Sequence, residues 1–144
     1  GTKKVPKNDL KIINKLLKKT IHWTTKDLGQ SIIASKNKIL LKEDRKGTNN
    51  LINRSLNKKY SKNSYIFIKI KKMHQDLRID LPTFGYETLK KLVKTNIKYI
   101  VLNANSTIIM DKKKTLKYLK KNKKTLLSVD IAVSNNNNVK INYE

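Results

Sequence analysis

Apolar side chains recur every three or four residues in four stretches of the chain, the spacing that places them on one face of a helix. In the first stretch, residues 8–21, Asn8 or Asp9 is the expected N-cap. In the third, Asn96 is expected to end the helix in the left-handed conformation. The predicted helices and their inward-facing residues are 8–21 (Leu10, Ile13, Leu16, Leu17), the helix opened by Gly47 and Thr48 (Leu51, Ile52, Leu56), the helix from Gly85 (Leu89, Leu92, Val93) and the helix capped by Asp111 (Leu116, Leu119).

Runs of β-branched and aliphatic residues predict strands between these helices. Residues 31–34 and 39–41 flank a polar turn and are typical of a hairpin, and residues 65–70 form the expected central strand. Because strands alternate with helices of about ten residues, we expect an α/β fold with a mixed or parallel sheet and flanking helices. The remaining predicted segments are strands at 99–102, 107–110 and 125–129, and a polar loop at 58–63.

The pattern predicts one domain over residues 1–133 and a disordered Asn-rich tail over residues 134–144. The chain has no cysteine, which excludes disulfides and thiolate metal sites. Its apolar runs are far shorter than the roughly 20 residues that a membrane-spanning helix needs. No apolar signal segment opens the chain, so a cytoplasmic location is expected.

The charge is strongly basic, with 34 Lys+Arg against 10 Asp+Glu and a formal net charge of +24. It comes from 31 Lys and only 3 Arg, beside 17 Asn and 17 Ile, the composition that an AT-rich genome imposes. Arginine and aromatic side chains, on which nucleic-acid readers rely, are scarce, so no specific nucleic-acid partner is expected. The charge still favours anionic surfaces, including phospholipid head groups at about 1 kcal/mol per well-placed Lys.

One segment concentrates groups suited to phosphate chemistry. If residues 76–80 are extended, Asp76, Arg78 and Asp80 share one side, and Pro82 then ends strand pairing. The two carboxylates would lie about 13 Å apart at 3.3 Å per residue, too far to share one ion unless the chain bends. Two carboxylates, a guanidinium, two ammonium groups and a helix N-terminus together suit a divalent metal that holds a phosphorylated ligand. The groups are Asp76, Asp80, Arg78, Lys69, Lys72 and the helix N-terminus at Gly85.

Structural interpretations of the same residues remain open. Asp76 and Arg78 are also compatible with a structural ion pair, Asp80 with a cap before Pro82, and Gly85 with an ordinary helix start. The two histidines are 52 positions apart and have no metal-ligand spacing. The chain contains no phosphate-binding P-loop, nucleophile elbow, zinc motif or dinucleotide-binding loop.

Residues 69–88 read K-x-x-K-x-x-Q-D-x-R-x-D-x-P-x-x-G-x-x-T. This long motif resembles the signature of the C-terminal domain of the LpxI family, the UDP-2,3-diacylglucosamine pyrophosphatases of lipid A biosynthesis. The resemblance extends over residues 10 to 130 or so and includes Gly47, Thr48 and Arg54. Members of the family are two-domain cytoplasmic enzymes, so the resemblance implies that this chain is the C-terminal domain and that the N-terminal domain is absent.

The resemblance implies Mg²⁺-dependent hydrolysis of the pyrophosphate of UDP-2,3-diacylglucosamine, giving UMP and 2,3-diacylglucosamine 1-phosphate. Asp80 and Asp76 would be the catalytic and metal-binding carboxylates. Peripheral contact with the inner membrane is expected, and an oligomer is compatible with the resemblance. The implied substrate-binding residues are Lys69, Lys72, Gln75, Arg78, Gly85, Thr88, Gly47, Thr48 and Arg54.

Three positions depart from the family pattern: Asn49 and Asn103 stand where carboxylates are usual, and Asn105 stands where glycine is usual. The departures and the absent domain predict low activity for the isolated chain. A second interpretation is a non-enzymatic basic module that binds RNA or an anionic membrane. Asp80→Asn separates the two, because it abolishes turnover only under the first.

Overall fold

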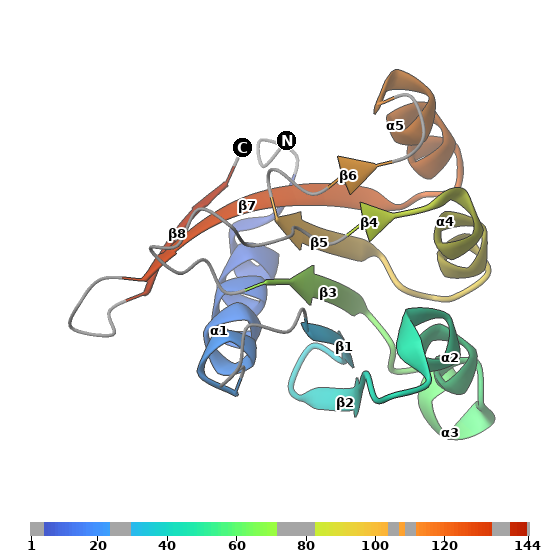
Figure 1. Ribbon diagram of the computed structural model, residues 1–144, viewed down its shortest axis with the longest axis horizontal. Coiled ribbons are helices and arrows are strands. Elements are labelled where there is room, and N and C mark those ends of the chain that lie inside the picture. The colour runs from blue at the N-terminus through green and yellow to red at the C-terminus, as the bar shows by residue number, and fades with distance from the viewer. Residues whose placement is uncertain are drawn as a thin grey trace.

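The computed structural model describes residues 5–23, 30–71, 83–103, 107–108, 112–133 and 139–143. Helices and strands alternate along most of the chain, and Figure 1 shows their arrangement. In chain order they are α1 (Lys7–Trp23), β1 (Gln30–Ala34), β2 (Ile39–Lys42), α2 (Gly47–Ser55), α3 (Lys58–Ser61), β3 (Ile66–Ile70), β4 (Thr83–Phe84), α4 (Tyr86–Val93), β5 (Tyr99–Asn103), β6 (Thr107–Ile108), α5 (Lys112–Lys121), β7 (Thr125–Val133) and β8 (Val139–Tyr143).

The main sheet has six strands in the order β2-β1-β3-β5-β7-β8. Strands β3, β5 and β7 are parallel, whereas β1 is antiparallel to both β2 and β3, and β8 is antiparallel to β7. It follows that β2, β3, β5 and β7 all run in the same direction. Their carboxyl ends therefore meet at one edge of the sheet, which we call the carboxyl edge. The short strands β4 and β6 form a separate parallel pair.

Helices cover both faces of this sheet. One hydrophobic cluster joins α1 to one face, and a second joins α2, α4 and α5 to the other, as the two sides of the sheet in Figure 1 show. The central strand β3 contributes to both clusters, with Ile66, Ile68 and Ile70 facing α1 and Phe67 facing the other helices. Burial on both faces explains why four of the five residues of this strand are apolar instead of alternating with polar ones, Lys69 being the exception.

The sequence-based prediction of an α/β fold with a mixed sheet and flanking helices is confirmed. All four predicted helices and the predicted hairpin are present, and residues 66–70 are the central strand as expected. The prediction of an α/β fold is correct because each element carries enough apolar residues on the face that it buries.

Two inward-facing assignments are wrong. Leu116 is 43% exposed, because the buried stripe of α5 runs through Thr115 and Leu119, four residues apart, and Leu116 is rotated away from that stripe. Leu56 is 44% exposed: it is the C-cap residue of α2, and the buried residues of that helix are Leu51, Ile52 and Ser55.

Three local predictions are also corrected. The expected polar loop at 58–63 contains the short helix α3, whose N-cap side chain, Asn57, accepts a hydrogen bond from the Lys59 N–H. Asn96 is not left-handed: among the described non-glycine residues only Lys123 has a positive φ, of 60°. Helix α1 begins at Lys7, before Asn8 and Asp9, so neither of these two is its N-cap.

The prediction of a disordered tail is wrong for residues 139–143. These residues form β8, which pairs with β7 along its whole length, and β7 itself continues to Val133. Val139, Ile141 and Tyr143 alternate with polar residues and pack against the α1 cluster. The preceding asparagine run, which suggested disorder, lies outside the described residues.

Asp9 fastens α1 to the sheet instead of capping the helix. Its Oδ2 atom accepts hydrogen bonds from the hydroxyls of Tyr65, at 3.1 Å, and Tyr99, at 2.5 Å. The two rings pack edge to face with centroids 5.5 Å apart. Burial, reinforced by the bond to the Asp9 carboxylate, raises the pKa of both hydroxyls above the usual tyrosine value.

We expect stability to fall at alkaline pH through these tyrosines. Their contribution is complete below the unfolded tyrosine pKa of about 10 and is lost as the pH rises from there through the raised pKa values of the folded state. Urea unfolding between pH 8 and 11 should show a shallower loss of stability in Tyr99→Phe than in the unaltered chain. Tyr86→Phe, at a tyrosine that is 44% exposed, is the control, and equal pH dependence in the two variants would contradict the assignment.

Candidate functional site at the carboxyl edge

A row of polar side chains crosses the main sheet close to its carboxyl edge. Ser31 in β1 is the register partner of Lys69 in β3, and the Glu43 N–H donates to the Ser31 carbonyl at 2.9 Å. Register partners on antiparallel strands lie on the same face, which here is the face covered by α2. The strand pairing thus brings Glu43, Ser31 and Lys69 side by side beneath the start of α2.

Thr48 joins the two charged members of this row. The Lys69 ammonium donates to Thr48 Oγ1 at 2.9 Å, and the same hydroxyl donates to the Glu43 carboxylate. Thr48 is the second residue of α2, so this chain of hydrogen bonds places a cation at the N-terminus of the helix. A helix N-terminus already favours anions through its dipole and its free N–H groups, and the Lys69 ammonium adds to that preference.

Helix α4 is held beside α2 by two side-chain contacts. Thr88 donates to the Asn49 side-chain oxygen at 3.0 Å, and Lys91 donates to the Asn53 side-chain oxygen at 3.2 Å. Two predicted site regions, Gly47–Thr48 and Gly85–Thr88, are thereby brought to the same end of the molecule. Asn49, one of the departures from the family pattern, accepts the Thr88 hydroxyl with an amide oxygen, an acceptor that asparagine shares with aspartate.

Asn103, the second departure, ends β5 and is 4% exposed. Its side chain accepts the Lys71 N–H at 2.6 Å and donates to the Lys71 carbonyl at 3.4 Å. An aspartate could accept the first bond but could not donate the second. The asparagine therefore fixes the backbone where the chain leaves β3, a role that the sequence reasoning missed.

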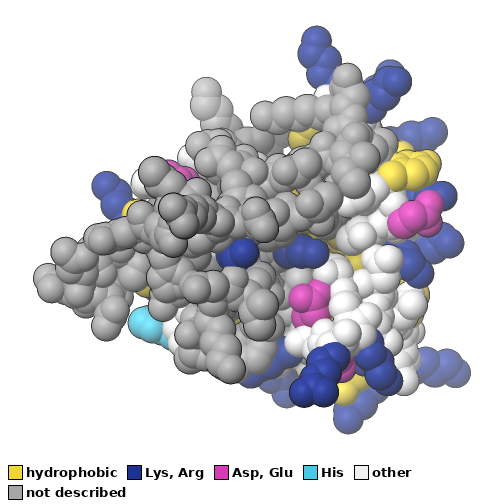
Figure 2. All heavy atoms as spheres, viewed as in Figure 1, with side chains coloured by type: hydrophobic (Ala, Val, Ile, Leu, Met, Phe, Trp, Pro, Cys, Tyr) yellow, Lys and Arg dark blue, Asp and Glu magenta, His cyan; other side chains and the backbone are white. Residues whose placement is uncertain are grey.

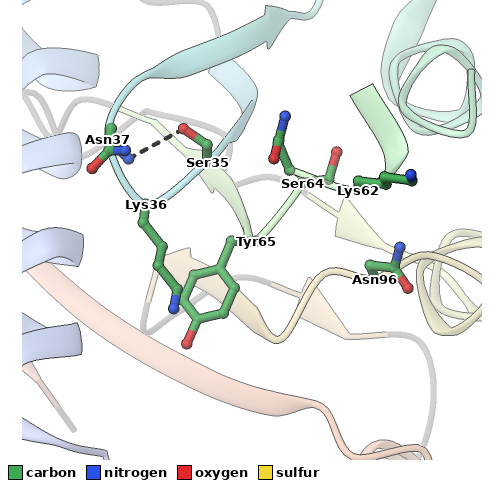
Figure 3. A pocket seen from close by; sticks show the side chains of 8 residues that line it. Ser35, Lys36, Asn37, Lys62, Ser64, Tyr65 and Asn96 are labelled. Carbon is green, nitrogen blue, oxygen red and sulfur yellow. Dashed lines mark hydrogen bonds between the residues drawn. The ribbon is translucent and has the colours of Figure 1, made fainter. Parts of the chain in front are cut away.

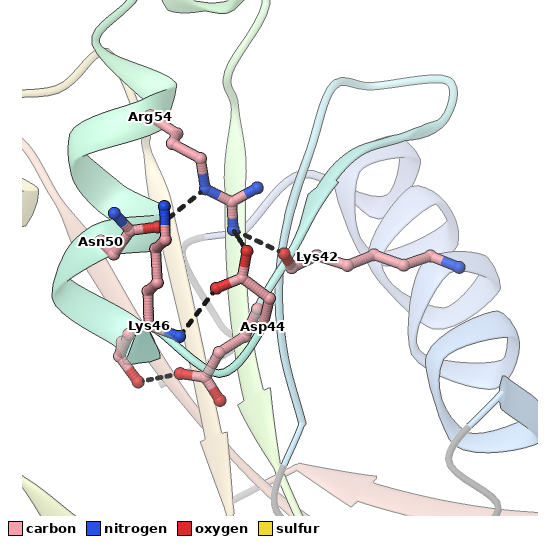
Figure 4. Close-up of polar contacts among 7 residues, drawn as sticks. Lys42, Asp44, Lys46, Asn50 and Arg54 are labelled. Carbon is pink, nitrogen blue, oxygen red and sulfur yellow. Dashed lines mark hydrogen bonds and ion pairs between the residues drawn. The ribbon is translucent and has the colours of Figure 1, made fainter.

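Arg54, predicted to bind substrate, contacts the loop between β2 and α2 (Figure 4). Its guanidinium donates to the Lys42 carbonyl at 2.7 Å and to the Asn50 side chain at 3.1 Å, and it lies 3.7 Å from the Asp44 carboxylate. Both charged groups are partly exposed, so the ion pair itself contributes little to stability. The described contacts make Arg54 a support of the loop that leads to Thr48.

Gly47 begins α2 with φ of +88°, a conformation that side chains with a Cβ rarely adopt. Its N–H donates to the Asp44 carbonyl at 3.0 Å and closes the turn into the helix. No described atom lies within 4 Å of the position that a Cβ would occupy, so the requirement for glycine comes from the backbone alone.

Gly47→Ala is expected to lower the free energy of unfolding by about 1–2 kcal/mol, the cost of the left-handed conformation. Urea denaturation measures this loss. Gly47→Asn should cost less, since asparagine tolerates the same conformation. Equal losses in the two variants would show that space rather than φ limits this position.

A family model described as LpxI C-terminal domain matches residues 1–127. The chain belongs to the LpxI C-terminal domain family. No curated protein matches the chain. The resemblance inferred from residues 69–88 is confirmed, and LpxI membership places the chain among hydrolases of lipid A synthesis that act on a lipid-linked sugar nucleotide.

The detailed reaction expected from the LpxI resemblance is corrected. We expected Mg²⁺-dependent hydrolysis of the pyrophosphate of UDP-2,3-diacylglucosamine to UMP and 2,3-diacylglucosamine 1-phosphate. The match is to the C-terminal domain of a family of UDP-2,3-diacylglucosamine hydrolases. The match identifies neither the bond cleaved, nor the products, nor a metal. The detailed reaction is therefore wrong as a statement about this chain, and membership of a family of UDP-2,3-diacylglucosamine hydrolases replaces it.

Five of the predicted site residues in the LpxI motif lie outside the described part of the chain. The structure does describe both ends of their segment, Lys71 on one side and Thr83 on the other. Lys71 is bound to Asn103 at the end of β5, and Thr83 begins the strand that leads to α4. The roles of these five residues stay predictions: Lys72, Gln75, Asp76, Arg78 and Asp80.

The described residues do not form a metal site by themselves. Within the described ranges no three His, Cys, Asp or Glu side chains gather to hold an ion. Glu43 accepts the Thr48 hydroxyl and Asp44 faces Arg54, so both carboxylates already have partners. The expectation of Mg²⁺ therefore rests on Asp76 and Asp80. Among the described helices, none is both long enough and apolar enough to cross a membrane.

A pocket of about 250 Å³ lies at the opposite edge of the sheet (Figure 3). Lys36, Lys62, Tyr65 and Asn96 contribute to its lining, and the Lys36 ammonium lies 4.8 Å from the centroid of the Tyr65 ring. None of the predicted LpxI site residues that the structure describes lines it. Lys and Arg side chains project along the right-hand and lower rim of the face shown in Figure 2. With 34 Lys+Arg in the chain, charge alone does not single out a site.

Proposed function

We propose that the carboxyl edge binds phosphate groups of a lipid-linked sugar nucleotide and that the chain serves a hydrolase of lipid A biosynthesis. The observation that carries this proposal is the hydrogen bond from the Lys69 ammonium to Thr48 at the N-terminus of α2. Family membership supports the substrate class.

The geometry suits an anion with several oxygens. Lysine has three N–H donors, and the bond to Thr48 uses one of them. The Glu43 carboxylate accepts a hydrogen bond from the Thr48 hydroxyl, which leaves the lone pairs of that hydroxyl for Lys69 and holds the ammonium at the helix start. A phosphate placed there would meet a cation together with the backbone N–H groups of α2.

The segment between β3 and β4 completes the proposal. Lys72 and Arg78 would neutralise further phosphate oxygens, Gln75 would position a polar group, and Asp76 and Asp80 would hold Mg²⁺, which offsets negative charge on the ligand. The described ends of this segment, Lys71 and Thr83, lie two positions along the chain from the predicted site residues Lys69 and Gly85, which supports such roles.

We further propose a cytoplasmic protein that makes peripheral contact with the inner membrane. A lipid-linked substrate is held at a membrane surface, and the net charge of +24 favours anionic head groups.

Equilibrium binding of UDP-2,3-diacylglucosamine in detergent micelles tests the proposal. We expect saturable binding that UDP displaces, because UDP carries the phosphates without the lipid. Binding that UDP leaves unchanged would show attraction to the micelle instead. Absence of binding by the folded chain would contradict the proposed substrate class.

A further inference from the structure

Ser31 carries a buried hydroxyl without a hydrogen-bond partner. The residue is 0% exposed, and its Oγ is unpaired among the described side chains. Buried serines elsewhere are satisfied: Ser55 donates to the Ile52 carbonyl at 2.6 Å and Ser64 to the Tyr60 carbonyl at 2.9 Å. A buried hydroxyl left unpaired opposes folding, so its retention calls for a partner that the described residues do not supply.

The position of Ser31 indicates where that partner would lie. Ser31 stands between Glu43 and Lys69 in the polar row and on the face that α2 covers. Thr48 spans the two charged neighbours above it. The unpaired hydroxyl therefore faces the same helix N-terminus as the Lys69 ammonium.

Two independent features thus point to one ligand. The start of α2 with Lys69 favours an anion, and Lys46, the N-cap residue, supplies no side-chain hydrogen bond in the described structure. The Ser31 hydroxyl needs an acceptor. Carboxylates and phosphates both accept hydrogen bonds, but a tetrahedral phosphoryl group also offers oxygens in several directions, which suits donors that come from the sheet and from the helix at once.

We propose that Ser31 donates a hydrogen bond to a phosphoryl oxygen bound at the N-terminus of α2, with Lys69 turning from Thr48 to the same group. This inference rests on the proposed function and deepens it by adding a ligand-binding residue from β1. The Ser31 hydroxyl and the Lys69 ammonium, which lie on neighbouring strands, then bind the same phosphoryl group.

Isothermal titration with inorganic phosphate and with UDP tests the assignment in Ser31→Ala, Ser31→Thr and Ser64→Ala. We expect Ser31→Ala to weaken binding of both probes by about tenfold, the effect of one hydrogen bond to a charged acceptor. Its thermal stability should be unchanged or higher, because an unpaired group is removed. Ser31→Thr keeps the hydroxyl and should keep affinity.

Ser64→Ala is the matched control, since it removes a buried hydroxyl that has a partner. It should lose stability and keep affinity. If Ser31→Ala binds both probes like the unaltered chain while Lys69→Ala does not, the Ser31 inference fails and the proposed function stands. If neither variant loses affinity, the phosphate site itself is contradicted. If Ser31→Ala binds inorganic phosphate more weakly but binds UDP like the unaltered chain, Ser31 does not contact the nucleotide and the inference is overturned.

Discussion

Lys69→Ala is expected to weaken UDP binding by about ten- to a hundredfold, the range for loss of a hydrogen bond to a charged group. The ammonium lies at the start of α2, where the helix dipole favours the same anion. Removing it leaves the Thr48 bond to Glu43 in place, so the helix start keeps one of its side-chain contacts while the cation is lost.

A chain with a charge of +24 attracts any anion, so the control must remove the same charge elsewhere. Lys62→Ala does this at the opposite edge of the sheet, in the lining of the 250 Å³ pocket. Titration of both variants at two salt concentrations separates the effects, since non-specific attraction weakens with salt in both. Equal losses in Lys62→Ala and Lys69→Ala would show that net charge, rather than the site, sets the affinity.

Leu51→Ala is expected to lower the free energy of unfolding by about 2–5 kcal/mol, the range for truncating a buried leucine. Leu51 is 0% exposed and belongs to the cluster that fixes α2 against the sheet. Because native proteins are stable by only about 5–15 kcal/mol, this is a large share of the total. The loss should loosen the helix that carries Gly47 and Thr48, so UDP affinity should fall as well.

Leu56→Ala provides the comparison, because the same truncation is made at a leucine that is 44% exposed and lies just beyond the same helix. Its effect should stay within about 0.5 kcal/mol. Urea denaturation of both variants measures the difference. The free energy of unfolding should depend on urea concentration with a similar slope in the two variants. Similar losses at the two positions would contradict the assignment of Leu51 to the core.

The fold could be predicted where burial leaves a simple period in the sequence. Helix α1 shows a helical repeat because one face packs on the sheet, and β3 is apolar at every position except Lys69 because both of its faces are covered. Strand β8 was missed because it follows an asparagine-rich run and shows only three alternating apolar residues. Leu116 was misplaced because the buried stripe of α5 uses Thr115, a polar residue that a hydrophobicity pattern does not count.

The site could be predicted as a set of residues but not as an arrangement. Gly47, Thr48, Lys69 and Thr88 were all expected to bind substrate, and the structure places them together near the carboxyl edge. Thr48 and Lys69 are 21 positions apart in the sequence and are brought together by strand pairing, which a local sequence pattern does not indicate.

The structural roles of the site region were harder to read from the sequence. The Asn103 side chain binds the backbone of Lys71, which lies 32 positions earlier in the sequence, so nothing near Asn103 in the sequence indicates the contact. Arg54 was expected to bind substrate, yet its described partners are the carbonyl and side chains of the loop beside it. Both residues hold neighbouring parts of the site in place, and no sequence motif indicates these contacts.

Phosphate binding at the carboxyl edge can be tested by nuclear magnetic resonance spectra of the ¹⁵N-labelled chain, recorded during titration with UDP. We expect the backbone amides of Gly47, Thr48 and Lys71 to shift in a saturable way, while those of Lys62 and Asn96 at the opposite edge do not. Saturable shifts confined to the opposite edge, or shifts spread evenly over the surface lysines, would contradict it.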